Sequence, residues 1–479
     1  MRTGRLVLNI EIAFLTLATL ALTNLVHAES SAKMSLDDFL KKAQLQNQKY
    51  QSAEQSAQAA KIKMGASGLD LEPTLNIQYS KSSDESQPNA LGSKTELESK
   101  SISLSKKFST GTSLTLSSGL NDINVTSPTV PTLDKYSTGN LGVSIRQSVW
   151  KDSFGANSRR VLNRENKTYE LEYRAAELER RRVLIQFESN FWDYLMAQED
   201  LKLKKENLDR STKLDRWTLK RVSNGISDQA DSMNAKALVA LRTLQMQSAE
   251  DELKAQEAIL RDTLELAENE PLPVLVGDLE KSRSHIDTIA NKTNVLPISA
   301  ILAQLEAQVK ALVAEEKLES QKPDLALFGS YTSNSFDRES SQALSKIDDG
   351  KLPKSQVGVS LTMPIGTGAK GSFVDAANGE ARAAERRAVK EISLGKTNWK
   401  EFLRRYEAVK KNVITLGEVA KYQESRARAE REKFGKGRTV TANVVTAETD
   451  SAEAESTLLK ARSNLRKLEA SIVMFEPYQ

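Results

Sequence analysis

The feature that most constrains this chain is an internal duplication. An alternating apolar segment, Leu141–Trp150, leads directly into a very long polar stretch with helical character, and a second such segment, Val357–Gly366, does the same. Aligning Val143 with Val359 places the two copies 216 positions apart. Solenoid repeats have periods of about 20–50 residues, so the repeated unit here is half of a protein. Each half must therefore join period-2 strands to a long helical segment.

The first 28 residues have the pattern of an export signal. Arg2 and Arg5 make a basic start, the run 12–25 is mostly apolar, and Val26-His27-Ala28 places small residues at positions −3 and −1 of a cleavage site. The apolar run is short for a membrane span. We predict a signal peptide over residues 1–28 and a mature chain that begins near Glu29, with an uncleaved anchor as the alternative.

The composition excludes several classes of function. The chain has no cysteine, which excludes disulfides, thiol catalysis and a lipidated cysteine. Its 68 basic and 64 acidic residues are nearly balanced and give no reason to expect nucleic acid. Mean hydropathy is −0.47, and no long apolar run follows the signal, so we expect no transmembrane helix. Such a chain can cross a membrane only as a closed β-barrel.

Short segments of alternating polarity are predicted to form strands. Their predicted ranges are 74–80, 100–108, 112–120, 140–149, 325–332 and 356–365. Strands of about 9–11 residues with one apolar and one small polar face are typical of membrane barrels. A soluble β-sandwich with a half-buried sheet is the alternative. In a membrane barrel, the lipid-facing side chains would be Leu75, Ile77, Leu141, Val143, Val357 and Val359.

Most of the remaining sequence is predicted to be helical. The stretch 152–222 would be roughly 105 Å long at about 1.5 Å per residue, too long for one compact globule, so it must belong to a coiled coil or bundle. Its apolar stripe is predicted to be core packing: Val183, Phe187, Phe191, Tyr194 and Leu195.

Two glycines interrupt the long helical blocks at corresponding places. The first block turns at Val222-Ser-Asn-Gly225 and the second at Phe434-Gly-Lys-Gly437. Glycine accepts the positive φ that such turns require. The return helices are predicted to be capped by Ser227 or Asp228 in the first block and by Thr439 or Thr441 in the second.

The order of these elements resembles that of the outer membrane factor family, and the resemblance covers essentially the whole chain after the signal. It implies an internally duplicated α+β membrane protein. Three copies would share one transmembrane β-barrel that continues into a long periplasmic α-helical coiled-coil tunnel. The implied segments are a signal peptide (1–28), a first periplasmic helix (29–72), first-copy barrel strands (73–150), a helical hairpin with its tip near 222–231 (151–270), an equatorial connector (271–296), a helix (297–322), second-copy barrel strands (323–366) and a hairpin with its tip near 434–443 (367–479).

The resemblance also implies a function. Such a homotrimer is the outer-membrane exit channel of a tripartite efflux pump or a type I secretion system in a Gram-negative bacterium, and it conducts substrates passively. Its implied partners are a periplasmic adaptor, an inner-membrane transporter and outer-membrane lipid, with no cofactor and no nucleic acid. The adaptor would meet the tip turns marked by Val222, Gly225, Phe434 and Gly437.

Two departures from the family pattern concern the gate at the tunnel end. The acidic residues six and nine positions after the second turn glycine are here Asn443 and Thr446, so the acidic ring is absent from its expected positions. Asp231 matches an acidic residue that helps to hold the closed state, and Arg438 can replace its usual arginine partner. The alternative for Asp231, of equal weight, is a favourable charge in the first turn of its helix.

A third departure concerns the number of strands. The family norm is two strands per copy, hence twelve in the trimeric barrel, but the first half of this chain has four predicted strands. We favour a wall that includes the extra pair, and an extracellular hairpin is the alternative.

No catalytic or metal-binding pattern is present in the sequence, so we predict that the protein is not an enzyme. His285 is the one histidine after the signal. The competing function is a periplasmic coiled-coil scaffold of the cell envelope without channel activity. The two functions differ at the strands, because a scaffold would bury the apolar strand residues against its own helices. The sequence does not identify the cargo or the pump.

Overall fold

The computed structural model describes residues 33–66, 68–86, 92–281, 295–349, 351–363, 365 and 368–475. The predicted signal peptide and His285 lie outside these residues. The chain forms two compact units. The sheet unit consists of Gln55–Leu178 and Leu296–Thr397, and the hairpin unit of Met1–Glu54, Glu179–Val295 and Asn398–Gln479. Over the described ranges, no helix combines the length and the apolar character needed to cross a membrane.

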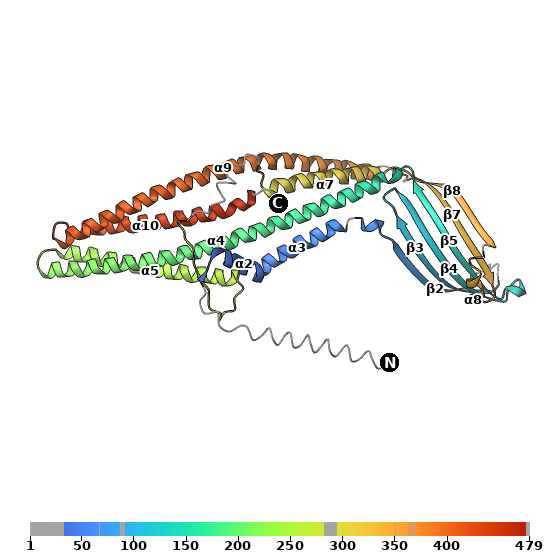
Figure 1. Ribbon diagram of the computed structural model, residues 1–479, viewed down its shortest axis with the longest axis horizontal. Coiled ribbons are helices and arrows are strands. Elements are labelled where there is room, and N and C mark those ends of the chain that lie inside the picture. The colour runs from blue at the N-terminus through green and yellow to red at the C-terminus, as the bar shows by residue number, and fades with distance from the viewer. Residues whose placement is uncertain are drawn as a thin grey trace, which may run out of the picture. The chain divides into compact units, whose positions relative to one another are not determined.

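The sheet unit contains one antiparallel sheet of six strands in the order β2-β3-β4-β5-β7-β8 (Figure 1). Every predicted strand is present, and the extra pair from the first half is part of the sheet. The two halves of the chain meet where β5 pairs with β7. The strands are β2 (Thr74–Asp84), β3 (Lys94–Lys107), β4 (Thr112–Thr126), β5 (Lys135–Ser148), β7 (Asp324–Asp337) and β8 (Leu352–Thr362).

Most of these strands extend further from the helices than the sequence predicts. Strands are predicted over 100–108 and 112–120, yet β3 begins at Lys94 and β4 continues to Thr126. Polar contacts join β3 and β4 there, with Ser99 Oγ 2.7 Å from Asn121 Oδ1 and Lys100 Nζ 3.2 Å from Asp122 Oδ2, and Leu97 pairs with Ile123. The hydrogen-bonded pairing of the strands therefore continues beyond the ends predicted from the sequence.

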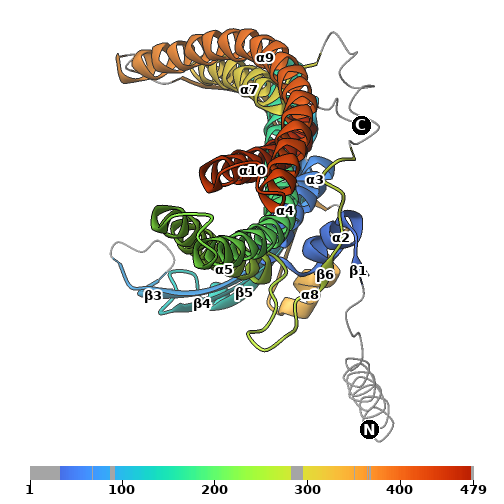
Figure 2. The ribbon, with the colours of Figure 1, turned by 90° about the vertical axis from the view of Figure 1, so that its left-hand side faces the viewer.

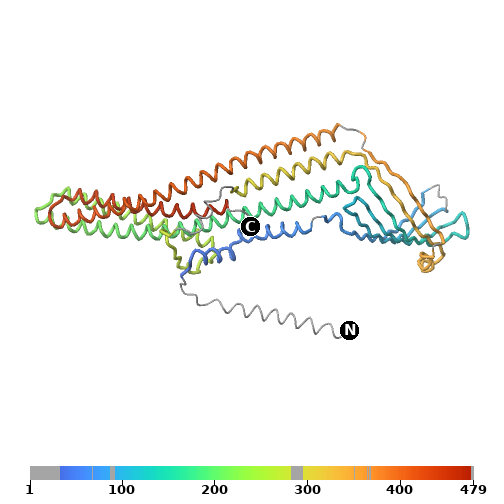
Figure 3. Tube along the Cα trace, turned by 45° about the horizontal axis from the view of Figure 1, so that its top comes forward, coloured from blue at the N-terminus to red at the C-terminus, as the bar shows by residue number. Residues whose placement is uncertain are grey.

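Four helices form a layer within the sheet unit in the order α3-α4-α7-α9 (Figures 1 and 3). Ion pairs join the neighbours: Lys63 to Glu172 at 2.9 Å, Arg164 to Glu316 at 2.7 Å, and Lys310 to Glu380 at 2.7 Å. The helices are α3 (Gln48–Gly65), α4 (Ala156–Ser223), α7 (Ile298–Ser320) and α9 (Gly368–Gly435). Helices α4 and α9 follow the last strand of each half, and both have 68 residues, as expected for a duplication.

The turn between β3 and β4 is fixed to the beginning of α4. Gly155 has φ 81°, and a Cβ there would lie 1.8 Å from the carbonyl oxygen of Ser109. Arg159 Nη1 donates to the same carbonyl at 3.2 Å.

The short helices of the sheet unit are η1 (Leu69–Leu71), η2 (Pro131–Leu133), η3 (Ser153–Gly155) and α8 (Ser340–Ser345).

The hairpin unit contains two helical hairpins, α4–α5 and α9–α10, which Figure 2 views from the end where their turns lie. The predicted apolar stripe of α4 is buried, from Val183 to Leu195, and packs with Phe39 of α2 and Leu260 of α5. The prediction that this apolar stripe packs in the core is confirmed. The additional elements are α2 (Leu36–Gln46), α5 (Gln229–Thr263), α10 (Thr441–Ala470) and η4 (Ser471–Phe475).

The N-terminal segment of the hairpin unit differs from its prediction. One first helix is predicted within residues 29–72, but it breaks at Asn47, which has ψ 120°. The Asn47 amide donates to the Thr263 carbonyl at 3.1 Å, and its Oδ1 accepts from the Tyr50 N–H at 3.2 Å. This side chain both ends α2 and caps α3. Nearby, β1 (Lys33–Met34) pairs in parallel with β6 (Val274–Leu275), which the sequence did not reveal.

Candidate functional site

The sheet has one continuous apolar face. The pairing places Leu75 opposite Leu104, Leu104 opposite Leu116, Leu116 opposite Val143, and Val143 opposite Tyr331, so these side chains share a face. All six predicted lipid-facing residues lie on it. The apolar side chains of this face are Leu75, Ile77, Tyr79, Ile102, Leu104, Leu114, Leu116, Leu120, Leu141, Val143, Ile145, Leu325, Leu327, Tyr331, Val357, Val359 and Leu361.

The apolar face is exposed to the surroundings of the chain. The exposed fractions of Leu75, Ile77, Val357 and Val359 are 59%, 71%, 89% and 64%. A soluble scaffold would bury these side chains against its own helices, and this chain does not. Contiguous apolar patches of this extent are rare on soluble monomers and mark membrane or protein interfaces.

The opposite face of the sheet is polar and mostly uncharged. It carries serine, threonine, asparagine and glutamine along all six strands. Alternation between an apolar and a polar face is the pattern of strands with lipid on one side and water on the other. Representative side chains of this face are Asn76, Gln78, Ser101, Ser103, Thr115, Ser117, Asn140, Ser144, Ser330, Thr332, Gln356 and Ser360.

Aromatic and charged residues bound the apolar face. Tyr79 and Tyr331 lie at its end away from the helices, and Phe108 lies at its helix end; all three are exposed. Beyond Tyr79 the same face places Lys81 opposite Glu98. Membrane barrels have such an apolar band between aromatic girdles. The sequence reasoning missed these aromatics, although their spacing along the strands could have identified them.

The two hairpin tips have the same backbone structure. At the first tip Gly225 has φ 68°, its N–H donates to the Val222 carbonyl at 3.0 Å, and the next N–H donates to Arg221 at 2.8 Å. At the second tip Gly437 has φ 71°, its N–H donates to Phe434 at 3.0 Å, and the next N–H donates to Lys433 at 2.8 Å. Both turns are Schellman motifs, in which glycine ends the helix.

The side chains at the tips are less alike. Val222 is half-buried, whereas Phe434 is only 1% exposed and packs with Leu214, Leu238 and Val444. Phe434 therefore lies in the core of the tip and does not present its ring to a partner.

Arg221 adds a second contact between the two hairpins at the same place. Its guanidinium lies 4.6 Å from the centre of the Phe434 ring, and its Nη1 donates to the Phe434 carbonyl at 2.9 Å. Arg221 belongs to the first hairpin and Phe434 to the second. The ring of Phe434 thus joins the two hairpins within one copy.

Only one of the predicted caps is present. Asp228 caps α5 by accepting from the Asp231 N–H at 2.9 Å. Helix α10 begins after Val440 without a side-chain cap, so the prediction for Thr439 and Thr441 is wrong. Thr439 instead donates its hydroxyl to Glu430 at 2.9 Å, while buried Thr441 packs inward.

The hydrogen bonds at Glu430 alter its ionisation. Lys433 Nζ donates to its Oε1 at 2.8 Å, and the hydroxyl of Thr439 donates to its Oε2 at 2.9 Å. These two bonds, the lysine first, hold the pKa of the Glu430 carboxyl below its ordinary value. The tip of the second hairpin is therefore tied together by an ionised carboxylate.

The predicted gate residues lie at the tips but do not meet within one copy. Asp231 is half-buried and Arg438 is exposed, and over the described residues neither side chain forms an ion pair. Asn443 and Thr446 are exposed, and their side chains bond only within the second hairpin, to Thr439 Oγ1 and the Ala442 carbonyl. Their roles at the gate stay predictions.

A buried charge cluster, formed by Arg210, Arg242, Glu448 and Glu455, lies between the hairpins. Arg210 of α4 approaches Glu448 at 3.4 Å and Glu455 at 3.3 Å, both on α10. Arg242 of α5 donates to the Glu448 carbonyl at 3.3 Å, and burial lowers the pKa of its guanidinium. The sequence did not reveal this cluster, because its arginines lie more than 200 residues from its carboxylates.

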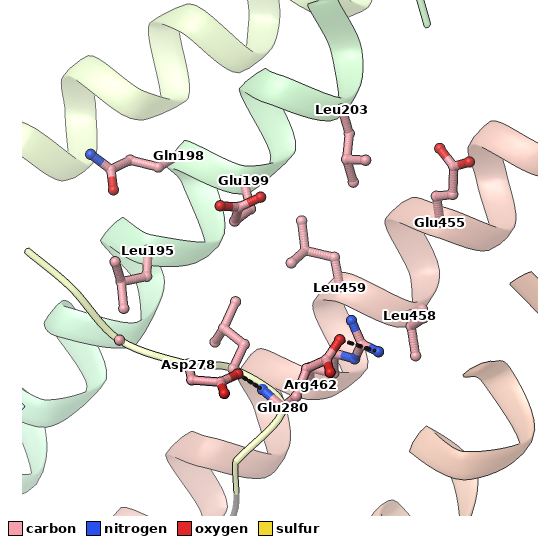
Figure 4. A pocket seen from close by; sticks show the side chains of 12 residues that line it. Leu195, Gln198, Glu199, Leu203, Asp278, Glu280, Glu455, Leu458, Leu459 and Arg462 are labelled. Carbon is pink, nitrogen blue, oxygen red and sulfur yellow. Dashed lines mark hydrogen bonds and ion pairs between the residues drawn. The ribbon is translucent and has the colours of Figure 1, made fainter. Parts of the chain in front are cut away.

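A cavity of about 380 Å³ lies in the hairpin unit between α4, α10 and the segment that follows β6 (Figure 4). Leu195, Leu203 and Leu459 line part of it, and an ion pair between Arg462 and Glu280 at 2.8 Å lies at its edge. The described residues contain no group of three histidine, cysteine or carboxylate side chains arranged to hold a metal ion. We assign no chemistry to this cavity.

Comparison with known proteins identifies the fold. The sequence matches no protein-family model and no curated protein. The structure is similar to CusC, which forms a transmembrane channel (TM-score 0.64, 12% identity, 95% of this chain and 96% of that one). It is also similar to the outer membrane protein VceC of Vibrio cholerae (0.64, 13%, 92% and 95%) and to the outer membrane channel CmeC of Campylobacter jejuni (0.64, 13%, 95% and 91%).

These similarities define a class of protein by its fold. They extend over almost the whole of each chain, so the protein has the fold of an outer-membrane channel. This is the fold of the outer membrane factor family, and the sequence resemblance is confirmed at that level.

Proposed function

We propose that this protein is a non-enzymatic channel in the outer membrane of a Gram-negative bacterium, with a periplasmic extension. The observation that carries the proposal is the six-stranded sheet with an exposed apolar face and a polar, mostly uncharged opposite face. Lipid contacts the apolar face, and water fills the space along the polar face. The solved channels with this fold support the same function.

The open edges of the sheet require further copies of the chain. Over the part of the chain that the structure describes, neither β2 nor β8 has a second partner within the sheet, so each has a row of unpaired backbone groups. Unpaired backbone groups cost several kcal/mol each in the hydrocarbon core, and only a closed barrel removes the edges. Three copies therefore join edge to edge, and their helices form a coiled-coil tunnel in the periplasm.

The channel is a passive exit duct. In the complete system a periplasmic adaptor contacts the hairpin tips, and an inner-membrane transporter supplies the energy. The duct serves a tripartite efflux pump or a type I secretion system. The exposed turns at Gly225 and Gly437 offer backbone to the adaptor, while Phe434 contributes through the packing of the tip.

The contacts between the hairpins hold the tip closed within each copy. Arg221 binds the ring and the carbonyl of Phe434, and Arg210 binds two carboxylates of α10. A pair between Asp231 and Arg438 of adjacent copies adds to this closure, and Asn443 and Thr446 line the narrow part of the tunnel. An exposed ion pair of that kind contributes only about 0.2–1 kcal/mol, so the buried contacts dominate.

The first experiment is to purify the mature protein in detergent and to measure its mass and its conductance in planar bilayers. A trimer that produces discrete, long-lived conductance steps is expected. A monodisperse monomer that needs no detergent and gives no conductance would overturn the proposal and favour the scaffold function.

A further inference from the structure

We propose that all six strands of each copy belong to the wall, so that three copies close an eighteen-stranded barrel, the size of the open aqueous pores. The proposal rests on the trimeric channel described above. It assigns a specific function to the β3–β4 hairpin, which widens the exit so that the barrel does not restrict cargo that the helical tunnel admits.

The β3–β4 hairpin has the properties of wall along its entire length. Strand β3 pairs with β2 from Thr95 to Ser105, and with β4 from Lys94 to Lys107. Strand β4 in turn pairs with β5 from Thr112 to Asn124. Its apolar residues lie in phase with those of the neighbouring strands, and its turn is fixed to Gly155. An extracellular flap would have none of these properties.

The two open edges are complementary. Strands β2 and β8 both have 11 residues, and they run in opposite directions, since five antiparallel steps separate them. Aligning the ends nearest the helices places Thr74 opposite Thr362 of the next copy. The same register places Leu75 opposite Leu361, Ile77 opposite Val359 and Tyr79 opposite Val357, all on the apolar face. A shift by one residue would place apolar side chains in the lumen.

This register also gives the tilt that a barrel requires. The hydrogen-bonded partners of Thr74 lead across the sheet through Ser105, Thr115, Ser144 and Ser330 to Gln356, which lies six residues from Thr362. Each copy of six strands thus advances by six residues. With about 3.3 Å per residue and about 4.8 Å between strands, the strands tilt by about 35°, within the range of known barrels.

The width of such a barrel follows from the same spacings. Eighteen strands at this tilt enclose a circle roughly 34 Å across between opposite backbones, whereas twelve strands give roughly 23 Å. The barrel circumference is then roughly 105 Å. The four helices per copy, spaced about 9–10 Å apart, require roughly 110–120 Å for three copies. Eighteen strands therefore give a barrel whose circumference is close to that of the wall of helices.

The first test uses disulfides between copies, which the absence of cysteine makes straightforward. Ser80→Cys with Gln356→Cys joins facing positions on the lumen side in the proposed register, where opposite Cα atoms lie about 4.5–5.5 Å apart. Oxidation is expected to give covalent dimers and trimers and nothing larger. The control pair, Ser80→Cys with Ser360→Cys, is four residues out of register and should remain monomeric. Cross-linking of the control alone would overturn the register, and a ladder that ends at dimers would overturn the strand number.

The second test asks whether the β3–β4 hairpin lies in the wall of the channel. Ser103→Cys lies on the polar face and Ser118→Cys on the apolar face. In proteoliposomes the first is expected to react with a water-soluble maleimide, and the second is not, because lipid keeps the thiol un-ionised. Equal reaction of both, in a protein that still conducts, would place the hairpin outside the membrane and overturn the inference.

The third test measures the width of the exit. Deleting residues 94–126 leaves β2 antiparallel to β5 and reduces the barrel to twelve strands. Polyethylene glycols of graded size, added to the barrel side, are expected to enter the native barrel at sizes that the deletion variant excludes. An unchanged size limit in a conducting deletion variant would overturn the inference alone. A native protein that forms no channel would instead overturn the proposed function.

Discussion

Replacing Phe434 with alanine tests how the second hairpin is held. The ring is 1% exposed and packs with Leu214, Leu238 and Val444, and Arg221 covers it at 4.6 Å. Removing a buried phenylalanine side chain costs about 3–5 kcal/mol. Because the ring lies between the hairpins, the closed arrangement loses this stabilisation when the hairpins separate. About 1.4 kcal/mol corresponds to a factor of ten, so the open fraction should rise at least roughly 100-fold per copy.

The assay is the open probability of single channels in planar bilayers. Phe434→Leu, which keeps most of the volume, should change the open probability far less. Phe402→Ala is the matched control: Phe402 is also buried, but it packs with Trp399, Leu465 and Phe475 inside the second hairpin. It should lower stability towards denaturant without opening the channel. Equal open probabilities for Phe434→Ala and Phe402→Ala would refute the assignment of Phe434 to closure.

The remaining predictions concern the sheet, a turn and the second tip. Val359→Arg, on the apolar face, should cost about 2–4 kcal/mol of membrane stability and lower the yield of folded trimer on semi-native gels, whereas Ser330→Arg on the polar face should not. Gly155→Ala should strongly reduce thermal stability, because its Cβ would meet Ser109 at φ 81°; Gly225→Ala at φ 68°, with open space around the Cβ, should cost only about 1 kcal/mol. The lowered pKa of Glu430 means that its bonds stabilise the tip above the ordinary glutamate pKa and that this contribution is lost as the pH falls through the lower, folded value. Hydrogen exchange at the second tip should show this loss, and Glu430→Gln should abolish its pH dependence.

Local patterns in the sequence predicted much of the fold. Strand alternation identified Leu75, Ile77, Val357 and Val359 as members of one face, because a period of two depends only on the strand itself. Gly225 and Gly437 identified the tips, because positive φ at a helix end depends on the residue itself.

Features that depend on distant partners were not predictable in this way. The break at Asn47 depends on a carbonyl 216 residues away, and the buried charge cluster joins Arg210 to Glu448 across two hairpins. The sequence located Phe434 at a tip, but only the packing shows that its ring points inward. At the outer ends of the strands the apolar residues change face: Leu97, Ile123 and Tyr136 pair on the face that is polar nearer the helices, so no single alternation runs along the whole strand.

The two unpaired edges of the sheet couple the folding of the protein to its assembly. A lone copy exposes the outward-facing backbone N–H and C=O groups of β2 and β8, two edge strands of eleven residues each, so folding in the membrane and joining the neighbours become a single event. In the proposed ring of three copies, every copy completes the edge of the next. One defective chain therefore inactivates the trimer that contains it. When half of the chains in a cell are defective, only about one trimer in eight consists entirely of intact chains. A mutation that damages an edge strand should therefore be dominant-negative over the intact gene.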